Sequence, residues 1–550
     1  MRWRTTVPIV VTLALALVST VPAAAAMPPG FSANSKASVQ GGSGWNEPAG
    51  VTGADNARYV SFQAPSRLSR ATRASNWSET GFTAYDNAKP DGDLGDVTMA
   101  ADRSGAVFLS HLTQNLQADI DYTRDGGATW QTAFNVAQLP FNPSAQPLAV
   151  DRPWIAAYSP DTNFLHTRVY LQYHDFVAST VWVVPCSVAF NATSGVDELK
   201  CGAPESSSNV QTACNSIPGG IAVAPPGSPH AGRVYSVWST ADPQTNATSG
   251  CNITQLAPFY RIYSAWSDNA DAGPAATWHQ SPVYIGPVND PKCPQTAPVS
   301  GVSTATCADV SELFTPVAID RAGNAYVAFV DYIDTLHAAY DVYLEVSMDG
   351  GTTWNGKADG SGLPFRVNHQ TGTHFFPTVA AGDAGRVAIG YVATSYVDRP
   401  YQAGDTCPTQ VPPMTSCQGK AMPEPPSTAW QVFVAESTNA TTTSPSFSEV
   451  RVSDPKVIIH YGDVCNLGIY CSGDQKGNRS LLDDNIVFID GAGFVTYAWT
   501  DQREDPTLLA DASGSNADSN QRKWDQVYTA CQTSGPSLYA KPNLALRTCQ

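Results

Sequence analysis

One eight-residue phrase occurs twice in this chain of 550 residues, and it constrains the fold more than any other feature. The first copy reads Thr123-Arg-Asp-Gly-Gly-Ala-Thr-Trp130, and the second reads Ser347-Met-Asp-Gly-Gly-Thr-Thr-Trp354. Two full copies of the pattern Ser/Thr-x-Asp-Gly-Gly-x-Thr-Trp do not arise readily by chance. A recurring phrase of this kind indicates a protein built from repeated structural units.

The chemistry of the phrase predicts a turn between two strands. Asp-Gly-Gly favours a tight turn because glycine accepts positive φ angles, and the Asp carboxylate can accept hydrogen bonds from N–H groups of the same turn. The Trp offers a large apolar ring that can pack between layers. Strand-like segments, 119–122 and 341–346, precede the two copies. We therefore assign structural roles to Asp125, Gly127, Trp130, Asp349, Gly351 and Trp354.

A second repeat sets the number of units. Apolar segments interrupted by Asp-x-x-Gly occur at residues 101–109, 319–327 and 489–497, and looser copies occur at 154–173, 221–238 and 380–391. Each copy predicts a strand, a turn and a second strand, and most precede the phrase or a degraded form of it. Six units of four strands each predict an all-β protein, a six-bladed β-propeller of four-stranded antiparallel blades.

The chain divides into three predicted regions. Residues 1–26 have a basic start, an apolar run from Val7 to Val21 and an alanine-rich end at Ala26, which is typical of a secretory signal peptide. The apolar run is too short for a membrane-spanning helix. Residues 27–90 are rich in Ser, Ala and Gly and predict a partly disordered leader, part of which could close the ring as a strand. Residues 91–550 form the predicted propeller.

The composition of the chain makes some classes of binding partner unfavourable. The chain has 48 acidic and 31 basic residues and a formal net charge of −17, which becomes about −19 when the signal peptide is removed. This negative net charge repels nucleic acid and anionic membranes, which are therefore unfavourable partners. The 42 glycines and 41 prolines suit an all-β protein with many turns. We expect a monomer without a transmembrane segment.

The cysteines support export. Their number, 12, is even, and they lie in sequential pairs. A sequence does not fix connectivity, but the simplest scheme joins Cys186–Cys201, Cys214–Cys251, Cys293–Cys307, Cys407–Cys417, Cys465–Cys471 and Cys531–Cys549. The alternative is a zinc site formed by Cys465, Cys471 and His460. Export favours the disulfides, because these bonds form and persist in oxidising compartments. No metal or cofactor is predicted, although a structural cation such as calcium is compatible with the acidic loops.

The phrase resembles the Asp-box, or BNR repeat, of sialidase-like β-propellers, and Asp151-Arg-Pro-Trp154 and Trp499-Thr-Asp-Gln-Arg503 are similar to strings in the exported bacterial branch of that superfamily. In those families the boxes lie away from the active site. The resemblance therefore places a site at the opposite mouth of the ring, where residues precede the first strand or follow the second strand of a unit. These candidates are Asp151, Arg152, His174, Asp175, Glu312, Asp331, His374, Asp483, Asp484, Asp501 and Arg503.

The catalytic signature of sialidases is incomplete. Those enzymes clamp the substrate carboxylate with three arginines and use a Tyr nucleophile paired with a Glu, plus an Asp acid. Arg152 and Arg503 occupy plausible mouth positions, and Arg399 or Arg479 could join them. The Phe/Tyr-Arg-Ile-Pro motif expected before the first blade is absent, and no Tyr–Glu pair can be assigned, so the catalytic residues stay open.

Two functions follow, and whether the protein is an enzyme stays open between them. The first is a secreted exo-glycosidase that releases terminal sugars, with sialic acid as the default substrate. The second is a non-catalytic secreted or cell-surface propeller that binds glycan or protein. The expected partner is a glycan or glycoconjugate. Because one fold hosts many functions, the fold alone does not choose between the two.

Overall fold

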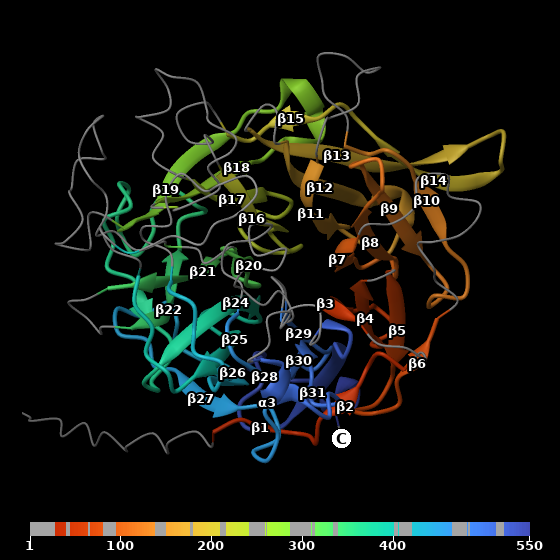
Figure 1. Cartoon of the computed structure of the whole chain (residues 1–550). Helices are drawn as coiled ribbons and strands as arrows, with labels where there is room; N and C mark the ends of the chain where they lie inside the picture. The colour runs from red at the N-terminus through yellow and green to blue at the C-terminus, as the bar shows by residue number, and fades with distance from the viewer. Residues whose placement is uncertain are drawn as a thin grey trace, which may run out of the picture.

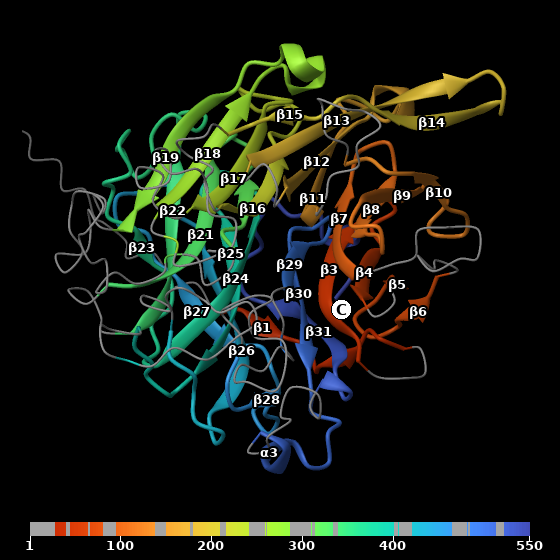
Figure 2. The same ribbon diagram turned by 45° about the horizontal axis from the view of Figure 1, so that its top comes forward.

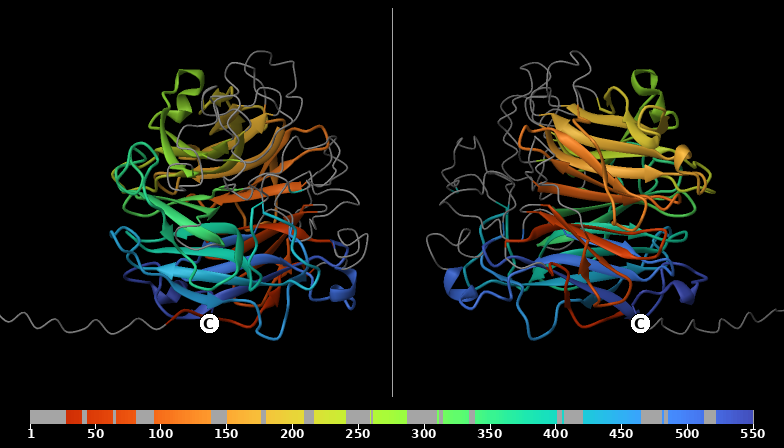
Figure 3. Two further views of the ribbon diagram at one scale, coloured as in Figure 1. Left: turned by 60° about the vertical axis from the view of Figure 1, so that its left-hand side comes forward. Right: turned by 90° about the vertical axis from the view of Figure 1, so that its right-hand side faces the viewer.

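A computed structural model describes residues 28–39, 44–63, 66–80, 95–137, 150–175, 180–208, 216–240, 259, 261–286, 310, 314–333, 339–400, 405, 421–464, 481, 485–512 and 522–549. These residues form seven antiparallel sheets arranged as the blades of a β-propeller (Figure 1). Side views show the sheets packed beside one another around the ring (Figure 3).

The first four blades follow one another along the chain. Blade 1 contains β3 (Asn46–Thr52), β4 (Arg58–Gln63), β5 (Arg67–Ala71) and β6 (Ser78–Glu79). Blade 2 contains β7 (Gly95–Ala101), β8 (Val107–Leu112), β9 (Ala118–Thr123) and β10 (Gln131–Ala133). Blade 3 contains β11 (Val150–Tyr158), β12 (Arg168–Asp175), β13 (Thr180–Asn191), β14 (Val196–Cys201) and β15 (Glu205–Ser206). Blade 4 contains β16 (Ser216–Val223), β17 (Val234–Thr240), β18 (Arg261–Ser267) and β19 (His279–Ile285). The hairpin of β13 and β14 projects outward from the ring (Figure 2).

The other three blades complete the ring. Blade 5 contains β20 (Val317–Ile319), β21 (Ala325–Tyr332), β22 (Tyr340–Ser347) and β23 (Phe365–Arg366). Blade 6 contains β24 (Thr373–Ala381), β25 (Val387–Thr394), β26 (Ala429–Ser437), β27 (Ser448–Arg451) and β28 (His460–Tyr461). Blade 7 contains β29 (Ile486–Ile489), β30 (Val495–Asp501) and β31 (Gln526–Ser534), joined by β1 (Gly30–Phe31) and β2 (Ser35–Lys36). Short helical turns are η1 (Phe164–His166), η2 (Ala270–Ala275), α3 (Leu508–Asp511) and η4 (Leu544–Leu546).

The prediction of six blades is wrong by one, because the expected leader contains a complete blade. All six residues of β4 are buried, and Trp45, Phe62 and Trp77 join a hydrophobic cluster with blade 7. The turn between β3 and β4 keeps the aspartate of the other units, since Asp55 Oδ1 accepts a hydrogen bond from Ala57 N–H at 3.0 Å. It lacks the Asp-x-x-Gly spacing, so the repeat did not reveal it. The propeller therefore begins well before residue 91.

Strands from both ends of the described chain close the ring. β1 and β2 pair antiparallel with β31, which places residues 30–36 beside residues 528–534. Joining the first strands to the last blade makes the propeller one continuous ring rather than an open row of sheets.

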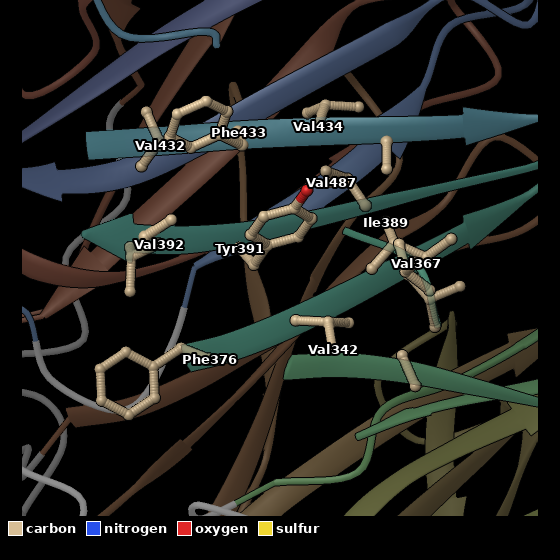
Figure 4. Packing of buried hydrophobic residues seen from close by; sticks show 14 of the residues in the cluster. Val342, Val367, Phe376, Ile389, Tyr391, Val392, Val432, Phe433, Val434 and Val487 are labelled. Atoms are coloured by element: carbon tan, nitrogen blue, oxygen red, sulfur yellow. The ribbon is translucent and has the colours of Figure 1, made fainter. Parts of the chain in front are cut away.

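The core lies between neighbouring blades. Figure 4 shows the packing of Val342 from blade 5, Tyr391 and Phe433 from blade 6, and Val487 from blade 7. Tyr391 and Phe433 stack with their ring centroids 6.2 Å apart. Each blade therefore buries its apolar faces against the blades on both sides.

Both copies of the phrase form the same hydrogen-bonded turn. Asp125 Oδ1 accepts from Thr129 N–H and Asp349 Oδ1 accepts from Thr353 N–H, both at 2.9 Å. Trp354 is fully buried and donates from Nε1 to Ser281 Oγ of blade 4 at 3.1 Å, whereas Trp130 is half-buried. The turns join the third and fourth strands of blades 2 and 5.

The structure contains the disulfides Cys186–Cys201 and Cys531–Cys549, two of the six predicted pairs. The other eight cysteines and the predicted signal peptide lie outside the described residues. Within the described ranges, the structure has no helix that is long and apolar enough to cross a membrane.

Candidate functional site

The first strand of each blade lines the centre of the ring, and five of these strands share a distortion near their beginning. The pairing register shifts after Asn46 in β3, after Gly95 in β7, after Asp151 in β11, after Pro218 in β16 and after Phe375 in β24. Such bulges turn a side chain out of its regular position in the sheet. All five therefore redirect side chains at one end of the ring.

Four of these bulges hold a non-glycine residue in the left-handed region. Their φ angles are 45° at Glu47, 49° at Asp96, 51° at Arg152 and 54° at Phe376. This conformation is unfavourable for residues with a Cβ atom, and such strain concentrates at functional sites. The four residues occupy equivalent places in blades 1, 2, 3 and 6.

A cavity of about 180 Å³ lies directly beneath the bulges and is lined by the first strands of all seven blades. Its aromatic wall includes Trp154, Phe314 and Phe376, and the rings of Trp154 and Phe314 meet edge to face with centroids 5.5 Å apart. The cavity is smaller than the roughly 300 Å³ at which pockets for drug-sized ligands begin. It suits one small ring rather than an extended ligand.

We call Glu47, Asp96, Arg152 and Phe314 the mouth cluster. Phe314 lines the cavity, and the three charged residues lie at the bulges, within two residues of strand positions that line it. Arg152 Nη1 lies 3.4 Å from Glu47 Oε2 and 3.8 Å from Asp96 Oδ1, and the guanidinium carbon lies 4.7 Å from the centre of the Phe314 ring. The side chains of Glu47, Arg152 and Asp96 are 1 %, 6 % and 17 % exposed. Only Asp96 therefore offers appreciable surface to a ligand.

Neighbouring blades fix the backbone of the mouth cluster. Glu47 N–H donates to Thr500 Oγ1 of blade 7 at 3.2 Å, and Asp96 N–H donates to Gln63 Oε1 of blade 1. The carbonyl of Pro153, next to Arg152, accepts from Thr98 Oγ1 at 2.8 Å. The site is thus assembled by contacts between blades 7, 1, 2 and 3.

The carboxylates of the mouth cluster are close enough for joint chemistry. Since one oxygen of Glu47 and one of Asp96 each lie within 4 Å of Arg152 Nη1, the two oxygens are no more than about 7 Å apart. Carboxyl pairs of glycoside hydrolases are separated by roughly 5–9.5 Å. Carboxylates of this kind can accept hydrogen bonds from hydroxyl or amine groups.

Of the predicted site residues, Arg152 lies in the mouth cluster and Asp151, half-buried, precedes it on β11. Asp151 pairs in register with His174 on β12, and Asp175 follows at the buried end of that strand. Burial lowers the pKa of His174 to about 4, so its imidazole is neutral at pH 7. Asp151 is therefore not neutralised by that histidine.

Three other predicted residues take part in contacts within or between blades. Asp331 Oδ2 accepts from Tyr284 Oη at 2.6 Å across blades 4 and 5. His374 Nδ1 lies 3.5 Å from Asp341 Oδ1, with both side chains fully buried. Asp501 accepts from Trp499 Nε1 at 2.9 Å. None of the three lines the cavity, and Glu312, Asp483 and Asp484 lie outside the described residues.

The arginines considered for a carboxylate clamp that the structure describes, Arg152, Arg399 and Arg503, each have a carboxylate partner of their own. Arg503 binds Asp501 through Nη2 at 2.6 Å and Nε at 3.0 Å and lies 4.1 Å above the Tyr528 ring. Arg399 makes two hydrogen bonds to Asp405, at 2.8 and 3.1 Å. Arg479 lies outside the described residues. Guanidinium groups held by separate carboxylates do not form a common clamp.

A second group of acids contains Asp398 and Glu424 from the connection between β25 and β26 and Asp463, which follows β28. Burial raises the pKa of Asp398 to about 8 and also raises the pKa values of Glu424 and Asp463. The negative charge of Asp463 adds to the increase for Asp398, and the charges of Asp463 and Asp398 add to the increase for Glu424. These carboxyls do not line the cavity. In the part of the chain that the structure describes, no group of three or more His, Cys, Asp or Glu side chains could hold a metal ion.

Sequence reasoning missed Glu47, Asp96 and Phe314. Glu47 belongs to the blade mistaken for a leader, and Asp96 begins the next blade. A usable signal was present, because Glu47, Arg152 and Phe376 each precede a proline at the start of the first strand of a blade. Proline disfavours the right-handed helical region for the residue before it, and in this chain the recurring x-Pro coincides with three of the bulged positions.

Comparisons with known proteins give distant likenesses only. No protein-family model and no curated protein matches the chain. Solved structures similar to it include a sialidase, Hz136, described as Hadza microbial, at 8 % identity, covering 87 % of this chain and 73 % of that one, with a TM-score of 0.40. An endosialidase of phage phi92 is 10 % identical, with coverage of 92 % and 69 % and a TM-score of 0.42. An α-L-arabinanase of Penicillium chrysogenum, complexed with arabinobiose, is 12 % identical, with coverage of 66 % and 94 % and a TM-score of 0.35.

Proposed function

We propose that this protein is a secreted propeller that binds the terminal unit of a glycan at the mouth of its central cavity. The observation that carries the proposal is the mouth cluster itself, a partly exposed carboxylate beside an aromatic-walled cavity. The predicted signal peptide and the two disulfides support export.

The size and lining of the cavity suit one sugar unit. A sugar presents hydroxyl donors at its edge and C–H groups on its faces. Asp96 can accept from the hydroxyls, while Trp154, Phe314 and Phe376 supply apolar walls. The volume of about 180 Å³ favours a chain end over an internal segment of a polysaccharide.

Hydrolysis of a terminal glycoside is the second candidate. The spacing of the Glu47 and Asp96 carboxylates favours it, because both retaining and inverting mechanisms need two carboxyl groups flanking the scissile bond. The burial of Glu47 counts against it, since a side chain that is 1 % exposed does not touch substrate in this conformation. Binding without turnover is therefore the better supported function.

A glycan array tests the proposal. We expect the wild-type protein to bind a defined set of terminal sugars and Asp96→Ala to bind them at least about tenfold more weakly, because a buried hydrogen bond to a charged group contributes about 1.5–3 kcal/mol. Asp359→Asn is the control, because Asp359 lies in the turn region after the second copy of the phrase and bonds Ser361 at 2.6 Å. Equal binding by wild type and Asp96→Ala, or binding of no glycan at all, contradicts the proposal. Release of sugar from aryl glycosides that is abolished by Glu47→Gln would favour hydrolysis instead.

A further inference from the structure

Two glutamates are buried in interfaces between neighbouring blades without a cation to pair with. Glu345 lies on β22 of blade 5 and is 0 % exposed, and Glu436 lies on β26 of blade 6 and is 2 % exposed. Among the described residues, no group donates a hydrogen bond to either oxygen of Glu345 or to Oε1 of Glu436. An ionised carboxylate in such a place would lose its water without compensation, so each side chain is stable there only with a proton.

Glu345 points into the interface between blades 4 and 5. Alternate residues of a strand share a face, so Glu345 lies on the same face as Tyr343, which packs in one hydrophobic cluster with Tyr284 of blade 4 and with Trp354. Directly opposite Glu345 in the sheet lies Val327 of β21. These surroundings are apolar or aromatic, and burial raises the pKa of Glu345 well above its usual range.

The charged or titratable groups near Glu345 do not compensate a negative charge on it. On the elements packed around it they are Tyr343 of β22, Tyr284 of β19, Arg366 of β23, and Lys357 and Asp359 of the loop after Trp354. Burial raises the pKa of both tyrosines, so they are neutral. Arg366 Nε pairs with Asp341 Oδ2 at 2.9 Å, and the side chains of Lys357 and Asp359 are exposed.

Glu436 lies in the interface between blades 6 and 7. Gln532 of β31 donates from Nε2 to Glu436 Oε2 at 3.2 Å. Within its own sheet Glu436 lies opposite Ala388 of β25 and Ser448 of β27, and neither is charged. Burial raises the pKa of Glu436 to about 8, and the hydrogen bond from Gln532 offsets only part of that increase.

Two arginines near Glu436 bind other groups. Arg386 Nη1 donates to Ser537 O at 2.8 Å, and Arg547 Nη2 donates to Gln532 O at 3.3 Å. The described residues include no ion-pair partner of Glu436. Its carboxyl therefore has an amide for a neighbour and no positive charge.

We infer that these two interfaces form a pH switch, which holds the blades together while Glu345 and Glu436 carry protons and loosens when they lose them. The ordinary pKa of both groups, 4.5, applies in the unfolded chain. Because the folded protein binds these protons more tightly, the stabilisation is complete below pH 4.5 and is lost as the pH rises through the folded pKa. The propeller is therefore best suited to acidic surroundings, whatever ligand it binds.

Urea unfolding at pH 6 and pH 8 tests the switch. In this range each extra proton of the folded state raises the unfolding constant about tenfold per pH unit. Glu345→Gln and Glu436→Gln replace the protonated carboxyl by an uncharged amide, so we expect the ratio of the wild-type to the variant unfolding constant to increase at least about tenfold from pH 6 to pH 8. Glu79→Gln is the control, because Glu79 of β6 is 43 % exposed, and its ratio should stay within about twofold. Other buried carboxyls with a raised pKa, such as Glu205, affect wild type and variants alike.

Hydrogen exchange locates the effect. After correction for the intrinsic pH dependence of exchange, wild-type amides of β19, β22, β26 and β31 should exchange faster at pH 8 than at pH 6. Glu345→Gln should protect β19 and β22, and Glu436→Gln should protect β26 and β31. Glu345→Met and Glu436→Met, which are also uncharged, repeat both measurements if a Gln variant fails to fold. A ratio of unfolding constants that does not change with pH for either glutamate, or protection that appears equally in all blades, would overturn the inference.

Discussion

Three charged residues of the mouth cluster occupy backbone conformations that glycine would adopt more easily. Glu47, Asp96 and Arg152 all have φ angles near +50°, which costs about 1–2 kcal/mol per residue relative to the right-handed region. The chain places long charged side chains at these positions in three consecutive blades. Strain that recurs at one structural position, and that directs charges to one point, is better explained by a binding role than by stability.

In the repeated phrase, by contrast, the polar residues stabilise the turn. In blade 4 Asn269 Oδ1 accepts from Thr277 N–H at 2.9 Å, and in blade 6 Asn439 Oδ1 accepts from Ser446 N–H at 3.0 Å. Both asparagines stand where Asp125 and Asp349 stand in the intact copies. The turn needs an acceptor at this place, and a negative charge is not essential to it.

This substitution pattern predicts how Asp349 responds to mutation. Asp349→Ala removes the acceptor for Thr353 N–H and Thr353 Oγ1, and we expect it to lower the free energy of unfolding by about 1–2 kcal/mol, as loss of a helix N-cap does. Asp349→Asn should cost less than about 0.5 kcal/mol. Urea unfolding of the two variants checks this, and an Asn variant as unstable as the Ala variant would show that the charge itself is needed.

At the scale of elements, residues 535–549, which follow β31 and which we call the strap, cross the turns between the first and second strands of neighbouring blades. Asp383 N–H of blade 6 donates to Leu538 O at 2.8 Å, Leu538 N–H donates to Gly493 O of blade 7 at 2.8 Å, and Asn56 Nδ2 of blade 1 donates to Leu546 O at 2.7 Å. The disulfide Cys531–Cys549 ties the end of this strap to β31. The strap therefore reinforces the seam at which the ring closes.

Removal of this disulfide should loosen the seam. We expect Cys531→Ser combined with Cys549→Ser to lower the free energy of unfolding by about 2–4 kcal/mol, since the bond closes a loop with a sequence separation of 18. Hydrogen exchange should speed up in blades 7 and 1. The matched control is Cys186→Ser with Cys201→Ser, which should affect only the projecting hairpin of β13 and β14, and equal exchange in blades 7 and 1 for both double variants would refute the role of the strap.

At the scale of the whole molecule, the sequence predicted repeats better than it predicted the site. Six blades were visible because three of them keep Asp-x-x-Gly in the turn and three have looser copies of the segment. The first blade was not visible, because the turn between Gly53 and Ala57 departs from that spacing and β6 has only two residues. Arg152 could be placed at a mouth from its position before a strand. Its partners Glu47 and Asp96 could not, because they belong to two other blades, and Glu47 lies 105 positions from Arg152 in the sequence, so the three residues meet only when the blades curve into a ring.

Sugar binding at the mouth of the ring is therefore the central claim, and a crystal structure of the protein with the sugar that binds most tightly on the glycan array tests it most directly. We predict density for one terminal sugar over the cavity lined by Trp154 and Phe376, with a hydroxyl or amine within hydrogen-bond distance of the Asp96 carboxylate and Arg152 still paired with Glu47. Sugar density at the turns that carry the repeated phrase, with the mouth empty, would contradict the account.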